Sequence, residues 1–158
     1  MSINTTTPIC VGEKLYIGSG KGGHLARVKN ISGVFSAEQL YLEIKAPTTL
    51  GGSVTSESYL YGTTGTALLC TEYETGKVKW EDRSVGAASI LFADGRLYLH
   101  GENGEFALVE ALPTGYRELG RFTPPDLPSH SSAKAWNYPV ISNGRLYIRD
   151  LGSLWVYD

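Results

Sequence analysis

The 158-residue sequence has little cysteine and no long apolar run. Cys10 and Cys70 are its two cysteines, and each lies in a short apolar segment of strand-like composition. We therefore expect two buried thiols rather than a disulfide framework. No apolar run approaches the ~20 residues that a membrane-spanning helix needs, so we expect no membrane span. The opening residues MSINTTTPIC lack a basic segment followed by an apolar one, which predicts no signal peptide and leaves the cell compartment open.

The sequence also lacks an excess of charge of one sign. It contains 14 Lys and Arg against 16 Asp and Glu, which gives a net charge of −2 without a long run of either sign. A nucleic-acid surface needs clustered Lys and Arg, so this class of partner is not expected.

Patterns typical of catalytic or metal sites are missing as well. His24, His100 and His130 do not occur at ligand spacing, and there is no Gly-x-Ser-x-Gly nucleophile elbow. In the glycine-rich segment around Lys21, the lysine is followed by glycine instead of the Ser or Thr of a phosphate-binding loop, which favours a hairpin turn. The sequence therefore predicts no catalytic residue and no metal ligand.

The residues that are abundant in the sequence are those that favour short strands and tight turns. Tyrosine (10 residues) and glycine (19 residues) are frequent, and no stretch shows sustained helical periodicity. The segments Tyr59–Gly65 and Tyr98–Gly104 both read Tyr-Leu-x-Gly-x-x-Gly, and related copies occur at Leu15–Gly20 and Gly144–Arg149. A repeat of about 40–50 residues with four strands in each copy is typical of a β-propeller.

We therefore predict an all-β fold, a single β-propeller domain over residues 1–158 with about four blades of four antiparallel strands, an architecture like that of WD40 proteins. Asp94-Gly95 and Asn143-Gly144 predict two of its hairpin turns, and residues near Ser36-Ala37-Glu38 are expected to form a loop. The predicted units are residues 8–44, 52–81, 88–122 and 138–157.

The last unit has three predicted strands, so it lacks an outer one. Residues 2–6 are the candidate closing strand, because propellers often complete one blade with a strand from the other end of the chain. Three arrangements fit this pattern: a small closed ring, half of an eight-bladed ring completed by a second copy, or a fragment of a longer ring. The second arrangement predicts a homodimer in which N-terminal strands are exchanged.

The segment Cys70–Trp80, CTEYETGKVKW, resembles the tryptophan-docking motif of quinoprotein-type propellers. Thr75, Gly76 and Trp80 match that motif, whereas Cys70 replaces its usual Ala and Glu72 its usual Asp. The resemblance implies that Thr75 and Gly76 form the turn before the outer strand, and that Trp80 packs against the next blade.

Over nearly the whole chain the repeats resemble PQQ-like propeller proteins. They most resemble the C-terminal part of large exported proteins of planctomycete-type bacteria, which implies a periplasmic or extracellular location. PQQ-dependent alcohol dehydrogenases of this fold hold their quinone beside two adjacent, disulfide-linked cysteines and bind Ca²⁺ through carboxylate and amide oxygens. This sequence has no adjacent cysteines and no carboxylates that match that pattern, so we expect neither PQQ nor Ca²⁺ as a cofactor.

Thr123–Asn137 is the one long irregular segment, and its Trp136 is expected either to pack at a blade junction or to contact a partner. The loops between blades and those between second and third strands should share one face of the propeller. Ordinary solvated turns are the alternative to a ligand site there. The candidate ligand-face residues are Lys21, Thr48, Thr49, Arg83, Glu102, Asn103, His130, Trp136, Arg149 and Asp150.

These patterns favour a non-enzymatic scaffold or binding module for protein–protein assembly, whose partner is another protein or a second copy of the chain. One alternative is a PQQ-dependent oxidoreductase. The other is a carbohydrate-binding or carbohydrate-processing module of an exported protein, which a cluster of aromatic rings around an acidic pair on the loop face would favour.

Overall fold

The computed structural model describes residues 6–49, 51–130 and 134–158, and the regular elements within them are all β-strands. They form four antiparallel sheets, here called blades 1 to 4, with the strands of each blade hydrogen-bonded in chain order. Blade 1 comprises β1 (Ile9–Val11), β2 (Lys14–Ser19), β3 (Gly22–Ile31) and β4 (Val34–Glu43). Blade 2 comprises β5 (Ser53–Ser56), β6 (Tyr59–Thr63), β7 (Leu68–Glu72) and β8 (Val78–Asp82). Blade 3 comprises β9 (Ala88–Ala93), β10 (Arg96–Gly101), β11 (Phe106–Glu110) and β12 (Glu118–Phe122). Blade 4 comprises β13 (Val140–Ser142), β14 (Arg145–Asp150) and β15 (Ser153–Tyr157).

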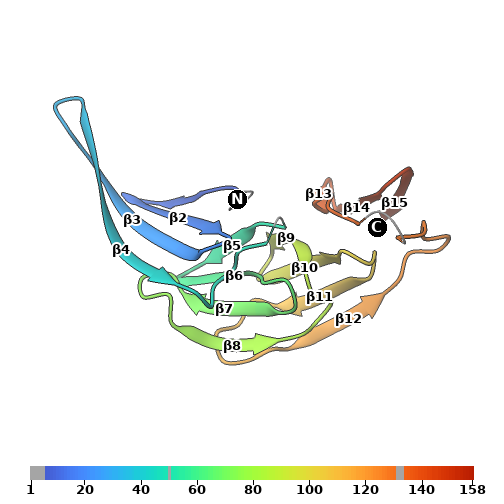
Figure 1. The fold of residues 1–158 in the computed structure, drawn as a ribbon. Helices are drawn as coiled ribbons and strands as arrows, with labels where there is room; N and C mark the ends of the chain where they lie inside the picture. The colour runs from blue at the N-terminus through green and yellow to red at the C-terminus, as the bar shows by residue number, and fades with distance from the viewer. Residues whose placement is uncertain (1–5, 50, 131–133) are drawn as a thin grey trace.

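The blades follow one another along an arc, with blade 1 at one end and blade 4 at the other (Figure 1). β5 contacts the first strands of both neighbouring blades, β1 and β9, whereas β4, β8 and β12 lie on the outside of the arc (Figure 1). Tight turns set this order locally: Asp94-Gly95 and Asn143-Gly144 both have positive φ angles at each residue, as type I′ hairpins require. The structure confirms the predicted all-β propeller fold.

One tyrosine recurs at the same place in all four blades. Tyr16, Tyr61, Tyr98 and Tyr147 are each the third residue of the second strand, and each pairs with an apolar residue of the first strand. The sequence repeat aligns Tyr59 with Tyr98, and that alignment is wrong by two residues, because the residue of blade 2 that pairs with the first strand as Tyr98 does is Tyr61. The hairpin register therefore defines the repeat better than the glycines do.

The recurrent tyrosine marks the side of each blade that faces the next one. In blade 2 the row Val54, Tyr61, Cys70 and Trp80 runs across all four strands. This row packs into one apolar cluster with blade 3, whose Leu97 and Leu99 are completely buried. Tyr16 of blade 1 is likewise buried, in a second cluster with Leu60 of blade 2. Each interface thus joins the tyrosine side of one blade to the opposite side of the next.

The β3–β4 hairpin is longer than the sequence predicts. Ser36-Ala37-Glu38, expected to form a loop, lies within β4, and the loop prediction is wrong. The turn is made by Ser32 (φ 52°) and Gly33 (φ 86°), so the strands continue pairing up to Ile31 and Val34. Beyond Arg27, which pairs with the first residue of β2, the hairpin continues as a two-stranded ribbon that projects away from the blades (Figure 1).

The two ends of the arc differ from the interior. Cys10, expected to be buried, is exposed on the outer side of blade 1, where no other blade of the described chain covers it. Residues 2–5 of the predicted closing strand lie outside the described residues, whereas Thr6 exchanges hydrogen bonds with the backbone of Gly18 in β2. No helix long and apolar enough to cross a membrane occurs among the residues described above.

Candidate functional site

Four of the predicted ligand-face residues come together where blades 3 and 4 meet. Glu102 follows β10, Asp150 ends β14, and His130 and Trp136 belong to the irregular segment that crosses between the two blades. The backbone of this segment is anchored by Ala135, whose N–H donates to the carbonyl oxygen of Glu102 at 3.1 Å.

The centre of this junction is a carboxylate between two imidazoles. Asp150 Oδ2 lies 2.8 Å from His130 Nε2 and 3.8 Å from His100 Nε2. His100 and Asp150 are completely buried, and the His130 side chain is 12% exposed. Neither oxygen of Asp150 makes a hydrogen bond of ordinary geometry to the described residues, and the His130 ring nitrogen is the closer of the two imidazole nitrogens to this buried carboxylate.

Sequence patterns alone do not single out His100. It lies two residues after Tyr98 in β10, and the period-two alternation of a strand places it on the same side, facing the next blade. Its Nδ1 contacts the backbone oxygen of Asn137 at 3.1 Å, and burial lowers its pKa. A neutral imidazole that contacts both the crossing segment and Asp150 is suited to holding that segment in place.

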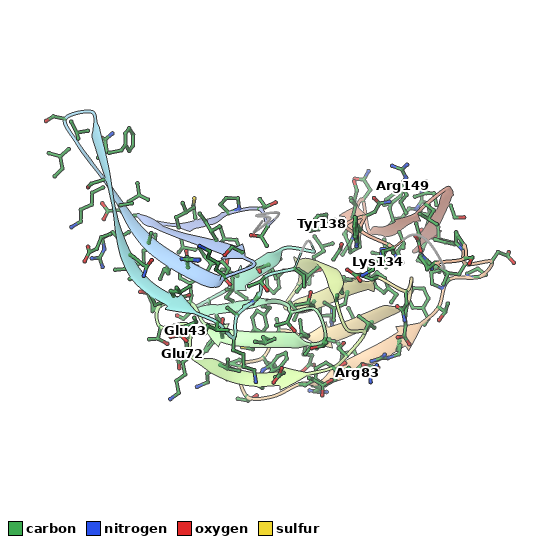
Figure 2. All side chains as sticks on the ribbon, viewed as in Figure 1. Glu43, Glu72, Arg83, Lys134, Tyr138 and Arg149 are labelled. Atoms are coloured by element: carbon green, nitrogen blue, oxygen red, sulfur yellow. The ribbon has the colours of Figure 1, made fainter. Side chains whose placement is uncertain are left out.

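A shallow hollow lies on the outer side of blade 4. Its volume is about 360 Å³, and Figure 2 shows Arg149 and Tyr138 on this end of the arc, with Lys134 nearby. Trp136 and Tyr138 are 53% and 44% exposed, so the hollow combines apolar rings with one guanidinium. The residues that line it are Trp136, Asn137, Tyr138, Val140, Tyr147, Arg149 and Leu154.

Polar contacts fix the rim of this hollow. Glu102 Oε1 accepts a hydrogen bond from the Trp136 indole at 3.2 Å, and Glu102 also forms an ion pair with Lys134. Asn103 is not one of the residues that line the hollow, and its Oδ1 accepts a hydrogen bond from the backbone N–H of Glu105. Among the described residues that line the hollow there is no carboxylate.

The remaining predicted residues lie elsewhere. Lys21 is in the β2–β3 turn of blade 1, where its backbone N–H donates to Ser19 Oγ. Arg83 lines a separate open hollow of about 760 Å³ beside Thr66 and Asp82, and Figure 2 shows it far from Arg149. Thr48 and Thr49 donate their backbone N–H groups to the carbonyl oxygen of Thr63. The structure therefore does not unite the predicted face into one site.

The docking residues join blades 2 and 3. Gly76 has a φ of 71°, and the Thr75 hydroxyl donates to Glu72 at 2.8 Å, which closes the turn before β8. The indole of Trp80 donates to the carbonyl oxygen of Leu112 at 2.7 Å, and its ring lies 6.0 Å from that of Tyr116 in an edge arrangement.

The cysteines and the possible metal ligands are distributed as follows among the described residues. Cys10 and Cys70 lie in different blades, so no adjacent cysteine pair exists. Within residues 6–49, 51–130 and 134–158, no group of three or more His, Cys, Asp or Glu side chains is arranged to hold a metal ion.

The fold and its blade-to-blade contacts are those of a β-propeller, and solved propeller structures share this fold. No protein-family model matches the chain, and no curated protein does.

Three similar structures are BamB from Moraxella catarrhalis, a europium-containing methanol dehydrogenase and the computationally designed Ika8 protein. BamB is 14% identical, with a TM-score of 0.67 over 96% of this chain and 43% of its own. The methanol dehydrogenase is 13% identical, with a TM-score of 0.58 over 93% of this chain and 36% of its own. Ika8 is 10% identical, with a TM-score of 0.62 over 98% of this chain and 45% of its own. The chain thus spans less than half the length of each.

Proposed function

We propose that the chain is a non-catalytic propeller module that mediates protein–protein assembly through the outer side of blade 4. The observation that carries this proposal is the exposed tyrosine row of that blade. Val140, Tyr147 and Val156 are paired across its three strands, as Val54, Tyr61 and Cys70 are in blade 2.

The equivalent rows differ sharply in exposure. Tyr61 and Cys70 are 1% and 0% exposed, because blade 3 covers them. Val140 and Val156 are 52% and 48% exposed, and the neighbouring Leu154 is 63% exposed. A contiguous apolar sheet face of this kind, with polar groups at its rim, is typical of a surface that binds another protein.

The opposite side of blade 4 is already occupied. Trp155 donates its indole N–H to the carbonyl oxygen of Pro125 at 3.0 Å, and the Tyr157 ring lies 5.1 Å from that of Phe122 in blade 3. The strand alternation of β15 therefore directs Trp155 and Tyr157 toward blade 3, and it leaves Leu154 and Val156 for a partner.

Site-specific crosslinking in cells tests this function whatever the partner is. A photoreactive amino acid at position 154 should form a covalent adduct with one defined protein, and Val156→Glu should abolish the adduct. The matched control is the same photoreactive residue at Leu119, which is 40% exposed on the outer strand of blade 3. Equal labelling from positions 119 and 154 would contradict the proposal.

A carbohydrate-binding module is the second candidate. It is favoured by the exposed rings of Trp136 and Tyr138 beside Tyr147 in the hollow of blade 4. Soluble fragments of cellulose and chitin should then quench tryptophan fluorescence in a saturable way, and Trp136→Ala should remove the effect. Quenching that persists in Trp136→Ala would argue against this candidate.

The finer parts of the proposal concern the partner and the location. A homodimer with exchanged N-terminal strands is supported by the three-stranded form of blade 4, and deletion of residues 1–7 should dissociate it.

A periplasmic or extracellular location is supported by the resemblance to exported propeller proteins. Function without PQQ or Ca²⁺ is supported by the missing cysteine pair. Cell fractionation with a specific antibody checks the location.

A further inference from the structure

Blade 1 has an exposed side that is the counterpart of the exposed side of blade 4. Leu15 and Ile17 are the second and fourth residues of β2, and they correspond to Leu97 and Leu99 of β10. Leu97 and Leu99 are completely buried against blade 2, whereas Leu15 and Ile17 are half-buried. The side of blade 1 that should face a preceding blade is therefore open.

A hollow on this side marks the missing contact. Its volume is about 480 Å³, and it lies beside the β1–β2 turn. Cys10 and Leu15 line it from the first two strands, and Val28 and Asn30 line it from β3. In the middle of the arc the corresponding space is filled by the tyrosine row of the preceding blade.

In blades 2 and 3, the turn between the third and fourth strands contacts the blade before it. In blade 2, Tyr73 donates its hydroxyl to the backbone oxygens of Ile9 and Lys14, at 3.3 and 3.2 Å. In blade 3, Leu112 accepts the hydrogen bond from Trp80 described above. The segments that precede β8 and β12 thus both contact the preceding blade, the first through a side-chain donor and the second through a backbone acceptor.

The β3–β4 hairpin is the equivalent segment of blade 1, and no blade precedes blade 1 in the described chain for this hairpin to contact. All residues from Lys29 to Gln39 are exposed, and Ile31, Val34 and Phe35 at its tip are 69%, 70% and 72% exposed. An isolated two-stranded ribbon is only marginally stable in water, so an apolar tip of this length is suited to docking on another surface.

We infer that the open side of blade 1, together with the β3–β4 hairpin, docks on the open tyrosine row of blade 4 of a second copy. This inference rests on the proposed function, because it names the partner of the same surface. The two open sides are the two halves of the interface that blades 2 and 3 make inside the chain, so one copy carries both the donor and the acceptor surface.

The length of the similar structures supports a second copy as the occupant. This chain covers 43% of BamB and 45% of Ika8, so two copies account for most of the length of either propeller. Two arcs related by a two-fold axis form the blade 1 to blade 4 contact twice and leave neither apolar side exposed. A head-to-tail contact that closes in this way also prevents open-ended polymerisation.

Light scattering across a concentration series tests the inference on the chain as it is. We expect a mass about twice 17.1 kDa, and we expect Phe35→Asp and Val156→Asp each to weaken the dimer by about tenfold or more. Leu119→Asp is the control, because Leu119 is an exposed leucine on a blade flanked at both sides. Circular dichroism of each variant establishes that it is folded.

Mixing the two variants gives the sharpest outcome. In a dimer of one Phe35→Asp chain and one Val156→Asp chain, one of the two contacts pairs an unaltered hairpin with an unaltered blade 4. A mixture of the two variant chains should therefore dimerise better than either variant by itself. A symmetric hairpin-to-hairpin contact would give no such recovery and would overturn the inference.

Cys10 provides an independent readout. It lies in the hollow of blade 1, so the dimer should protect it from alkylation, whereas the folded Phe35→Asp variant should expose it. A monomer at about 0.1 mM with Cys10 fully reactive would overturn the inference. If position 154 nevertheless crosslinks to a different protein, the proposed assembly function stands, and only the inference that the partner is a second copy of the chain is wrong.

Discussion

The indole nitrogen of Trp80 in blade 2 lies 2.7 Å from the carbonyl oxygen of Leu112 in blade 3. This hydrogen bond ties the outer strand of one blade to the turn of the next. The same ring packs against Tyr61 of its own blade and Tyr116 of blade 3, with ring centres 6.1 and 6.0 Å away. Polar and apolar contacts of one side chain thus hold two sheets together.

Replacement of Trp80 should loosen this interface in two steps. Trp80→Phe keeps much of the ring and loses the hydrogen bond, so we expect the free energy of unfolding to fall by about 1 kcal/mol. Trp80→Ala also loses the ring contacts, and we expect a fall of about 3 kcal/mol because the ring is only partly buried. Urea unfolding followed by circular dichroism measures both. Trp136→Ala, at an exposed ring, should cost less than about 1 kcal/mol; an equal loss there would contradict the docking role.

Stability should decrease in mild acid because of His100. Burial lowers the pKa of this imidazole in the folded chain, while in the unfolded chain it takes up a proton near pH 6.5. Below about pH 6.5 the unfolded state therefore binds more protons, and the free energy of unfolding falls as pH falls toward the folded pKa. Above that pH this contribution is constant. Urea titrations between pH 8 and pH 5 measure the slope, which His100→Gln should reduce; an unchanged slope would exclude His100 as its source.

Gly51 should tolerate no side chain. A Cβ there would lie 1.7 Å from the carbonyl oxygen of Ala88, because the entry to blade 2 passes directly against the start of β9. Gly51→Ala should therefore cost about 3 kcal/mol or more, since the backbone must move. Gly65→Ala is the matched control, because nothing lies within 4 Å of its added Cβ, and its effect should stay within about 0.5 kcal/mol. Thermal melts of the two variants decide the point, and similar melting temperatures would contradict it.

The two cysteines should differ greatly in reactivity. Cys70 is completely buried, and burial raises the pKa of its thiol to about 11. At pH 8 its thiolate fraction should be lower than that of an ordinary thiol by on the order of a hundredfold, quite apart from access. Mass spectrometry after iodoacetamide treatment of the folded Phe35→Asp variant, in which the dimer contact is weakened, should show labelling at Cys10 alone, and both sites should react in denaturant. Rapid native labelling of Cys70 would contradict its burial.

Local patterns in the sequence were sufficient for the fold. The Asp94-Gly95 and Asn143-Gly144 turns specify hairpins by themselves, because few other residue pairs adopt two positive φ angles in succession. Alternation and recurrent Tyr residues then indicate four similar sheets. The β3–β4 hairpin was predicted too short, since Ser32-Gly33 forms the same kind of turn without a strongly diagnostic sequence.

The candidate site was predicted only in part, because its members come from distant segments. Glu102, His130, Trp136 and Asp150 were all candidates, and the structure brings them together at one blade junction. Lys21 and Arg83, chosen by the same topological rule, lie elsewhere. The rule assigns loop residues to one face of a propeller. It does not indicate which of the loops on that face lie close to one another.

The sequence by itself determined that the chain is all-β, that it repeats, and where most of its strands turn, because these features depend on residues within a few positions of one another. Only the tertiary structure decided that Tyr61 is the equivalent of Tyr98, that His100 lies beside Asp150, and that Cys10 is exposed. Each of these depends on strand register or on the packing of one blade against the next. A shift of one residue reverses which side of a strand is buried, and no local pattern records which side a neighbouring blade will cover.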